Sequence, residues 1–315
     1  MKNNSNLINF GYACVNMNLA YPKNKNDKKI VTNRSMIKKT FLNKGIAYAS
    51  ELSFKNCNDL FKILKWNKRN NFNFYRVTSD LFPWCSEYEL DELPDYPKIK
   101  KILFQIGEYA KKNSMRLTFH PGPFNVLTSK NDDVVKNCIK DLSIQGEIFD
   151  LMKLDKTTFN KINIHIGGVY DSKKDAMKRF CKNFQLLPKS VTKRLTVEND
   201  DRESMYSVKD LYYGIYKKIN IPIVFDYHHH KFCNGGLSEE EALKLAISTW
   251  EKITPVVHYS ESRSKEKKDI NIKPQAHSDY VYNFINTYNQ NVDIMIEAKH
   301  KELAVIKYLK IHQIN

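Results

Sequence analysis

The sequence predicts an α/β protein consisting of a single (β/α)8 barrel, or TIM barrel, and three observations support this fold class. Short strand-like runs rich in Val, Ile and aromatic residues alternate with longer segments whose apolar residues recur every three or four positions. This alternation is typical of parallel β-α-β units. Eight strand-like runs are present, as a closed barrel requires, and neither a G-x-G-x-x-G nor a Walker A sequence indicates an open nucleotide-binding sheet.

The expected elements cover nearly the whole chain. The expected strands are residues 7–14, 73–77, 116–120, 161–166, 194–199, 221–227, 255–260 and 292–298. Helical periodicity is clearest in residues 55–70, 96–113, 133–153, 238–253 and 278–290. No Gly/Ser-rich or Pro-rich linker divides the chain, so we expect one domain over residues 1–315.

Composition excludes several classes of protein. A hydrophobic content of 42% is sufficient for a large core, and no run approaches the roughly 18 apolar residues of a membrane-spanning helix. The N-terminal stretch lacks the apolar region of a signal peptide, so we expect an intracellular protein, in the cytoplasm or nucleus. The six cysteines form no C-x-x-C pair, which argues against disulfides and a structural zinc knuckle.

The charge balance favours a polyanionic partner. The chain has 51 Lys and Arg against 35 Asp and Glu, a formal net charge of +16. Such an excess favours nucleic acid, although a compositional bias towards Lys, Asn and Ile is the alternative explanation. The lysine-rich segments 21–29 and 262–270 each follow an expected strand, which predicts βα loops on the face where barrels build active sites.

Metal-binding side chains recur at the ends of the expected strands. Six successive strands each carry one near the C-terminal end: His120, His165, Glu198, Asp226, His258 and Glu297. His229 and His277 follow in the next loops. A single such histidine is usually a hydrogen-bonded structural group. Six in register are different, because buried carboxylates are costly unless they are paired or coordinate a metal. The pattern therefore predicts a multinuclear metal site at the C-terminal face of the strands.

The ligand types narrow the choice of metal and of reaction. Carboxylates and histidines without cysteine favour Mn²⁺, Fe²⁺ or Zn²⁺ over Ca²⁺. Eight ligands suit two or three ions, with a carboxylate such as Glu198 as a bridge. Clustered divalent ions are suited to phosphodiester hydrolysis. Combined with the basic charge, the site predicts a metal-dependent nuclease.

Ten short motifs make the chain resemble the UV damage endonuclease family, relatives of endonuclease IV. They are "GYACVN" (11–16), "TNR" (32–34), "FYRVTSDLFPW" (74–84), "HPGPFNVLTS" (120–129), "HIGGVYDSKKDAMKRF" (165–180), "VENDDR" (197–202), "FDYHHH" (225–230), "VHYSE" (257–261), "PQAH" (274–277) and "MIEAKHKE" (295–302). The resemblance implies the same eight ligands, two or three divalent ions (Mn²⁺, with Zn²⁺ as an alternative), and damaged double-stranded DNA as partner.

The resemblance also implies an activity: nicking immediately 5′ of UV photoproducts, cyclobutane dimers and 6-4 products, with a 3′-hydroxyl and a 5′-phosphate as products. Such enzymes flip the damaged dinucleotide out of the stack, and weakened stacking at the lesion lowers the cost of extrusion. We assign catalysis to Glu198, Asp226, His258 and Lys299. Lys299 lies two residues past Glu297, where a phosphate would approach, although a solvated lysine is the plain alternative.

The DNA- and lesion-binding residues expected are Tyr12, Asn16, Arg34, Pro123, Phe124 and His230. Tyr12 and Asn16 match the family's probing residues, and Phe124 can stack on a base. The chain departs from the family at Pro123, where glutamine is frequent, and at Val256, where the family has a lysine that can be carboxylated. Val256 puts in doubt the third metal position, near His229 and His277.

The run His228-His229-His230 is internal, so it is not a purification tag. In register with Asp226, His229 is the expected ligand, and its two neighbours are supporting or DNA-facing groups.

Other functions remain open at this point. A sugar isomerase or epimerase also gathers His, Asp and Glu around divalent ions on this scaffold, but it needs no basic rim. An abasic-site endonuclease of the endonuclease IV type is closer, and activity on abasic sites could accompany the main one. A DNA-binding protein without catalysis is the third alternative. We expect a monomer.

Overall fold

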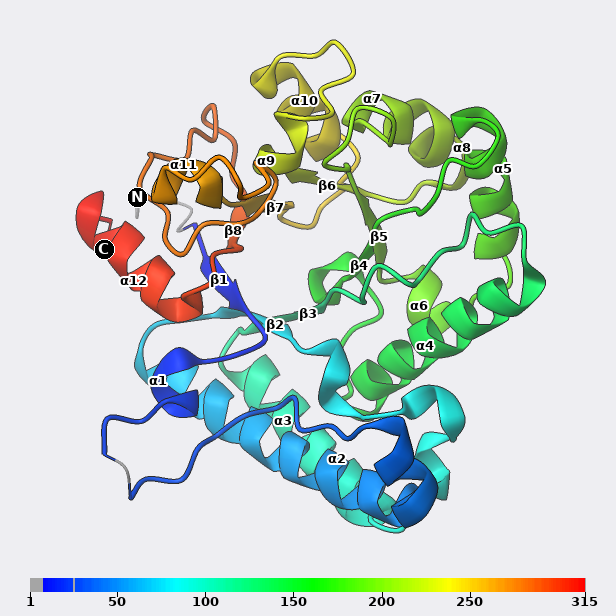
Figure 1. Cartoon of the computed structure of the whole chain (residues 1–315), viewed down its shortest axis with the longest axis vertical. Helices are drawn as coiled ribbons and strands as arrows, with labels where there is room; N and C mark the ends of the chain where they lie inside the picture. Colours follow the sequence, from blue (N-terminus) through cyan, green and yellow to red (C-terminus); the bar gives the residue numbers. More distant parts are fainter. Residues whose placement is uncertain (1–7, 25, 315) are drawn as a thin grey trace.

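Eight parallel strands form a closed barrel in the computed structural model, which describes residues 8–24 and 26–314 (Figure 1). Each strand pairs with the next along the chain, and β8 pairs with β1. The strands are β1 Phe10–Ala13, β2 Phe74–Val77, β3 Arg116–Phe119, β4 Ile162–Ile164, β5 Leu195–Glu198, β6 Ile223–Asp226, β7 Val256–Tyr259 and β8 Asp293–Ile296. All eight lie within the expected ranges, so the predicted TIM barrel is confirmed.

Helices follow the strands and surround the barrel (Figure 1). They are α1 Met17–Ala20, α2 Lys38–Arg69, α3 Tyr96–Lys112, α4 Asp132–Leu151, α5 Lys173–Phe184, α6 Lys189–Thr192, α7 Val208–Leu211, α8 Lys217–Ile219, α9 Tyr227–His230, α10 Glu239–Ile247, α11 Arg263–Lys267 and α12 Lys301–Ile311. Helix α2 is broken at Gly45, whose φ of 62° lies in the left-handed region. No helix among the described residues is long and apolar enough to span a membrane.

Four of the five expected helices are present, but the one at residues 278–290 is wrong. This segment is irregular because side chains from elsewhere take up its backbone N–H groups. The Glu266 carboxylate accepts from two of them, the Glu261 carboxylate accepts from two more, and the Tyr308 hydroxyl accepts from Ile285 N. Val281 and Ile285 are buried, so the apolar spacing reflects core packing of an irregular chain.

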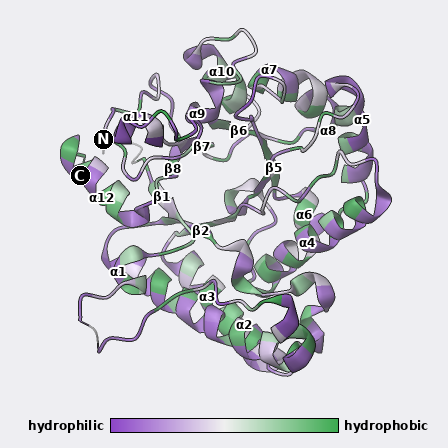
Figure 2. Ribbon diagram, viewed as in Figure 1, coloured by the Kyte–Doolittle hydropathy of each residue, from purple (hydrophilic) through white to green (hydrophobic). Residues whose placement is uncertain are grey.

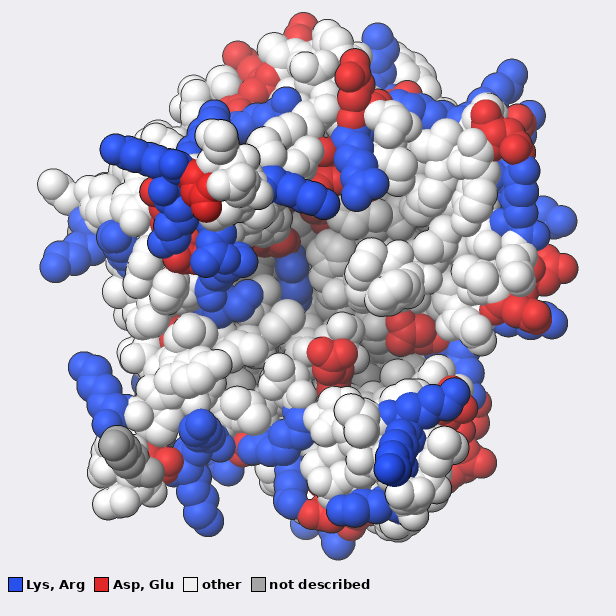
Figure 3. Space-filling model, viewed as in Figure 1, with Lys and Arg blue, Asp and Glu red and all other residues white. Residues whose placement is uncertain are grey.

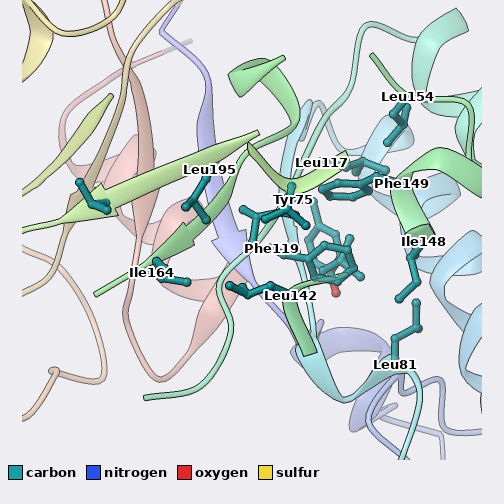
Figure 4. Close-up of a cluster of buried hydrophobic side chains, with 14 of the residues drawn as sticks. Tyr75, Leu81, Leu117, Phe119, Leu142, Ile148, Phe149, Leu154, Ile164 and Leu195 are labelled. Carbon is teal, nitrogen blue, oxygen red and sulfur yellow. The ribbon is translucent and has the colours of Figure 1, made fainter. Parts of the chain in front are cut away.

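The main core lies between the barrel wall and the helices. Helices α2 and α4 carry both hydrophobic and hydrophilic residues along their lengths (Figure 2), as expected of helices with one buried face. Figure 4 shows part of this core, where Leu142, Ile148 and Phe149 of α4 meet side chains of β2 to β5. The Phe119 and Phe149 rings pack with their centroids 4.6 Å apart. Burial of this apolar surface fixes the strands in place.

The inside of the barrel is layered. At the N-terminal ends of the strands, the Arg116 guanidinium forms a buried ion pair with Asp293, Nη1 to Oδ2 at 2.8 Å. Its other bonds go to backbone oxygens of Thr158, Phe159 and Thr254. An apolar group follows, made of Ala13, Phe74, Val224, Trp250, Val256 and Met295. The other end of the barrel is polar and holds the predicted ligands.

We expect Asp293→Ala to destabilise the fold by about 3 to 5 kcal/mol, because it leaves the buried Arg116 charge without its partner. Urea denaturation followed by circular dichroism measures this. Glu51→Ala, which removes an exposed ion pair with Lys55, is the matched control and should cost at most about 0.5 kcal/mol. Equal losses in the two variants would contradict the role given to the buried pair.

Candidate metal centre

The strand ends bring the predicted ligands together at one mouth of the barrel. Glu198 and Asp226 are the last residues of β5 and β6, His258 lies in β7, and His120 directly follows β3. His165 and Glu297 directly follow β4 and β8 in the same way. A pocket of about 570 Å³ opens here, lined by six of the eight predicted ligands: His120, His165, Glu198, His229, His277 and Glu297.

Seven of the eight predicted ligands fall into three groups whose donor atoms lie within 4.8 Å of one another. The groups are His120/His165/Glu198, Glu198/Asp226/His229 and Asp226/His258/Glu297. Glu198 and Asp226 each belong to two groups, as bridging carboxylates would. His277 belongs to none of them, but its ring centroid is 6.2 Å from that of His229.

Glu198 is the centre of the cluster and is only 1% exposed. Its Oε2 lies 3.1 Å from His120 Nε2 and 2.9 Å from His258 Nδ1, and it accepts a hydrogen bond from Asn163 Nδ2. Its Oε1 lies 3.5 Å from His229 Nδ1. One carboxylate therefore contacts side chains from strands on several sides of the barrel.

Four of the five predicted ligand histidines are held by a contact at Nδ1. Nδ1 lies against a backbone carbonyl in three of them, at 3.2 Å in His120, 2.9 Å in His229 and 2.8 Å in His277. A carbonyl only accepts, so each Nδ1 carries the hydrogen and each Nε2 keeps its lone pair. In His165, Nδ1 lies 3.0 Å from Asp200 Oδ1, a carboxylate–histidine pair typical of metal sites.

His258 is oriented the opposite way. Its Nδ1 faces Glu198 and also lies 3.1 Å from Glu297 Oε1. Its Nε2 lies 3.2 Å from Lys161 Nζ and 3.3 Å from Arg76 Nη2. The Arg76 guanidinium also forms an ion pair with Glu297.

The residues present fit divalent metal ions. Glu198 Oε1 and Asp226 Oδ2 are buried and have no hydrogen-bond partner in the structure. Buried carboxylate oxygens without partners are costly, and a cation removes that cost. Histidine nitrogens with free lone pairs beside them complete a donor set suited to Mn²⁺ or Zn²⁺.

Burial sets the protonation of the cluster. It lowers the pKa of His258 to about 3 and raises the pKa of Asp226 to about 6. Burial opposes protonation of His165, but the hydrogen bond to Asp200 and the charge of Glu198 outweigh it and raise the pKa of His165 to about 10. Burial also lowers the pKa of Lys161 well below its ordinary value. Protons on Asp226 and His165 therefore compete with a bound cation.

The other two histidines of the run are structural. His228 Nε2 lies 3.1 Å from Gln275 O, and the His230 ring packs at 5.3 Å from the Phe225 ring. Both are buried. His230, expected to face DNA, does not reach the surface in this conformation.

The expected lesion-binding residues divide into buried and exposed sets. Tyr12 and Asn16 are fully buried, with Tyr12 OH bonded to Asn67 Oδ1 at 2.5 Å and accepting from Asn16 Nδ2 at 2.8 Å. Asn16 also caps α1. Arg34 is tied to Asp59 at 2.6 Å. These three residues order the β1–α2 connection. Contact of Tyr12 or Asn16 with DNA would require that connection to rearrange, whereas the Arg34 side chain is 27% exposed.

Pro123, Phe124 and Lys299 lie at the surface. Phe124 is 87% exposed, on the loop that follows His120. Such exposure is unusual for a large aromatic side chain and leaves the whole ring free to stack on a partner. Lys299 is exposed two residues past Glu297, as expected.

Sequence reasoning missed four polar residues of the site: Arg76, Lys161, Asn163 and Asp200. Arg76, Lys161 and Asn163 interrupt or adjoin otherwise apolar strands, "FYRV" and "KINIHI". These polar residues could have been identified from the sequence, since a charged or amide residue in a buried strand needs a partner. Asp200 lies next to the ligand strand, in "ENDD".

Comparison with known proteins adds independent information. A family model described as "UV-endonuclease UvdE" matches residues 8–315. The chain is 35% identical to the UV-damage endonuclease of Schizosaccharomyces pombe, over 96% of this chain and 50% of that protein, so it spans about half the length of this relative. It is 30% identical to the putative UV-damage endonuclease of Acanthamoeba polyphaga mimivirus, over 96% of this chain and 91% of that protein.

Solved structures agree with this assignment. The crystal structure of SacUVDE matches with a TM-score of 0.81 at 30% identity, over 97% of this chain and 98% of that one. A D-psicose 3-epimerase from Clostridium cellulolyticum matches with a TM-score of 0.52 at 11% identity, over 92% of this chain and 85% of that one. The second match shows a shared fold alone.

We expect Glu198→Gln to bind at least one Mn²⁺ ion fewer than the unaltered chain, because it removes the carboxylate shared by two ligand groups. Elemental analysis after gel filtration counts the ions, and circular dichroism checks the fold. Glu203→Gln, at an exposed position nearby, is the control and should bind the full set. A full complement in Glu198→Gln would mean that the ligand assignment is wrong.

Metal affinity should fall as the pH is lowered. Asp226 must be ionised to bind a cation, and with its pKa raised to about 6 its ionised fraction falls roughly tenfold between pH 7 and pH 5. Isothermal titration with Mn²⁺ across this range should show at least that loss. Asp226→Asn should bind more weakly and with a shallower pH dependence. An affinity that is constant from pH 7 to pH 5 would contradict the assignment of Asp226.

Proposed function

The chain belongs to the UV-endonuclease UvdE family, and on that premise we propose that it is a DNA repair endonuclease that nicks one strand immediately 5′ to UV photoproducts by metal-dependent hydrolysis. The observation that carries this proposal is the buried cluster of three carboxylates and five histidines at the barrel mouth. Two or three divalent ions, Mn²⁺ in our assignment and Zn²⁺ as the alternative, would supply Lewis acidity and a hydroxide when bound.

The chain's own residues would hold and orient the reacting groups. Glu198 and Asp226 bridge the ligand groups, and His258 links Glu198 to Glu297 across the cluster. The ammonium of Lys299, on the rim beside Glu297, would contact the scissile phosphate. Attack by water on phosphorus would break its bond to the 3′ oxygen, which leaves a 3′-hydroxyl and a 5′-phosphate.

Lesion recognition would fall to the loop that follows His120. The Phe124 ring would stack on a base at the distorted step, while Pro123 stiffens the loop without offering a side-chain hydrogen bond. Tyr12, Asn16 and Arg34 would contribute by holding the neighbouring connection in shape, and the buried Tyr12 and Asn16 would contact DNA only after it rearranges.

Charge favours damaged double-stranded DNA over a small sugar as substrate. Figure 3 shows a hollow near the middle of one face, with Lys and Arg side chains gathered beside it over α11. Both lysine-rich segments are in βα connections, one after β1 and one containing α11. A basic surface of this kind steers a polyanion, whereas an epimerase does not need one.

The direct test is an incision assay with Mn²⁺ on labelled duplexes that carry one cyclobutane dimer, one 6-4 product, one abasic site or no damage. The expected result is a single nick 5′ of each photoproduct, and ligation assays identify the ends. Nicking of the abasic duplex alone would support an endonuclease IV-type activity instead. Cleavage of none of them, with conversion of a ketose, would support the epimerase alternative.

We expect Phe124→Ala to lower the preference for damaged over undamaged duplex by about 5- to 160-fold, since stacking on one base is worth about 1–3 kcal/mol. Competition binding at fixed salt measures the preference. Phe284→Ala removes another exposed ring, 66% accessible and remote in sequence, and should leave it unchanged. Equal behaviour of the two variants would remove Phe124 from lesion recognition.

A further inference from the structure

We propose that Lys161 is a positioning residue for His258, holding its ring so that Nδ1 points at Glu198 and Glu297. The inference deepens the proposed function and rests on it, because it concerns how the same cluster binds its metals. Lys161 directly precedes β4, and its side chain crosses the barrel interior to reach His258 on β7, with Nζ 3.2 Å from Nε2.

The burial of Lys161 requires an explanation. The residue is 0% exposed, and among residues 8–24 and 26–314 its Nζ forms no ion pair with a carboxylate. Lysines are almost never fully buried unless they are paired, because desolvation of the amine is costly. A methionine would fill the same volume without that cost. The only hydrogen-bond partner of the amine among the described residues is His258, so this contact is what the lysine provides.

His258 needs such a partner more than the other ligand histidines do. The rings of His120, His229 and His277 are fixed by backbone carbonyls, and that of His165 by Asp200. All four are held at Nδ1. His258 is reversed, so its fixed nitrogen is Nε2, and in the described part of the chain this nitrogen has no carbonyl or carboxylate partner. Lys161 occupies the position that a carbonyl occupies beside the other rings, and its contact with Nε2 fixes the orientation of the His258 ring.

Arg76 does not replace it. The guanidinium is already paired with Glu297 and lies slightly further from His258 Nε2, at 3.3 Å. Val256, two residues before His258, belongs to the apolar group inside the barrel and offers no polar atom. The structure instead places a lysine from the opposite wall of the barrel beside His258 Nε2.

The test compares Lys161→Met with Lys161→Gln. Both side chains fill similar space, but only glutamine keeps a terminal polar group that can bond Nε2. Titration calorimetry with Mn²⁺ should show one class of sites in Lys161→Met reduced about 10- to 100-fold in affinity. Lys161→Gln should recover part of that loss. The spectrum of the Co²⁺-loaded protein should change in Lys161→Met, because the coordination of His258 changes.

Thr118→Val is the matched control. Thr118 is fully buried on β3 with a hydroxyl that has no hydrogen-bond partner, so the substitution alters the barrel interior without removing a hydrogen bond. Its Mn²⁺ affinity should equal that of the unaltered chain. Thermal melting of all three variants separates a loss of fold from a loss of metal.

Unchanged Mn²⁺ affinity and an unchanged Co²⁺ spectrum in Lys161→Met would overturn the proposal. Equal losses in the methionine and glutamine variants would also overturn it, because they would indicate packing alone. These results do not depend on nicking. An unaltered chain that binds Mn²⁺ but leaves irradiated DNA intact would overturn the proposed function and leave the Lys161 test valid.

Discussion

The buried carboxylate of Glu198 is the interaction on which the site depends. It lies at the end of β5, almost without solvent contact, and contacts side chains of β4, β7 and α9 and that of His120, which directly follows β3. Taking a carboxylate out of water is tolerated only where positive charge or hydrogen-bond donors converge on it. The closed barrel provides that convergence, because parallel strands end at one mouth. The fold and the site therefore depend on each other. The register of the barrel strands decides which side chains reach Glu198, and the ligands converge only in that register.

This geometry explains which parts of the fold and of the site could be predicted from the sequence. A strand pattern and its last residue suffice to place a side chain at the mouth, so the barrel and the convergence of His120, His165, Glu198, Asp226, His258 and Glu297 were predictable. Contacts across the barrel were not. Lys161 and Arg76 meet at His258 from different walls, and sequence spacing does not say which interior side chains face each other. Periodicity also failed at residues 278–290, where Glu261 and Glu266 take up backbone donors that a helix would have used internally. For Tyr12 and Asn16, matching a motif could not reveal burial.

There is also a physical reason why the metal ligands lie on rigid elements and the proposed recognition residues lie on exposed loops. Three of the five ligand histidines, His120, His229 and His277, are fixed by backbone carbonyls of strand ends and of the loops next to them, so the orientation of these rings does not depend on flexible side chains. In the proposed function, recognition would instead fall on protruding groups such as Phe124 and on the lysine-rich connections. Long-range charge attracts any DNA equally and cannot distinguish a lesion. Under this proposal, discrimination would come from contacts at the mouth, where an exposed aromatic ring would meet a weakened base stack.

An apolar layer inside the barrel separates the candidate metal centre from the ion pair at the other end. Below the ligands lie Phe74, Val224, Val256, Trp250 and Met295, and below these the Arg116–Asp293 pair lies near the N-terminal ends of the strands. An apolar layer excludes water from under the cluster and lowers the local dielectric constant. Attraction between cations and the carboxylates of Glu198, Asp226 and Glu297 is then stronger than it would be in water. The same layer makes any uncompensated charge near it expensive, and the buried Glu198 and Asp226 oxygens that lack a hydrogen-bond partner carry this cost until a cation binds. Val256 therefore belongs to the apolar layer. The polar contacts that hold His258 come from Lys161 and Arg76, on other walls of the barrel.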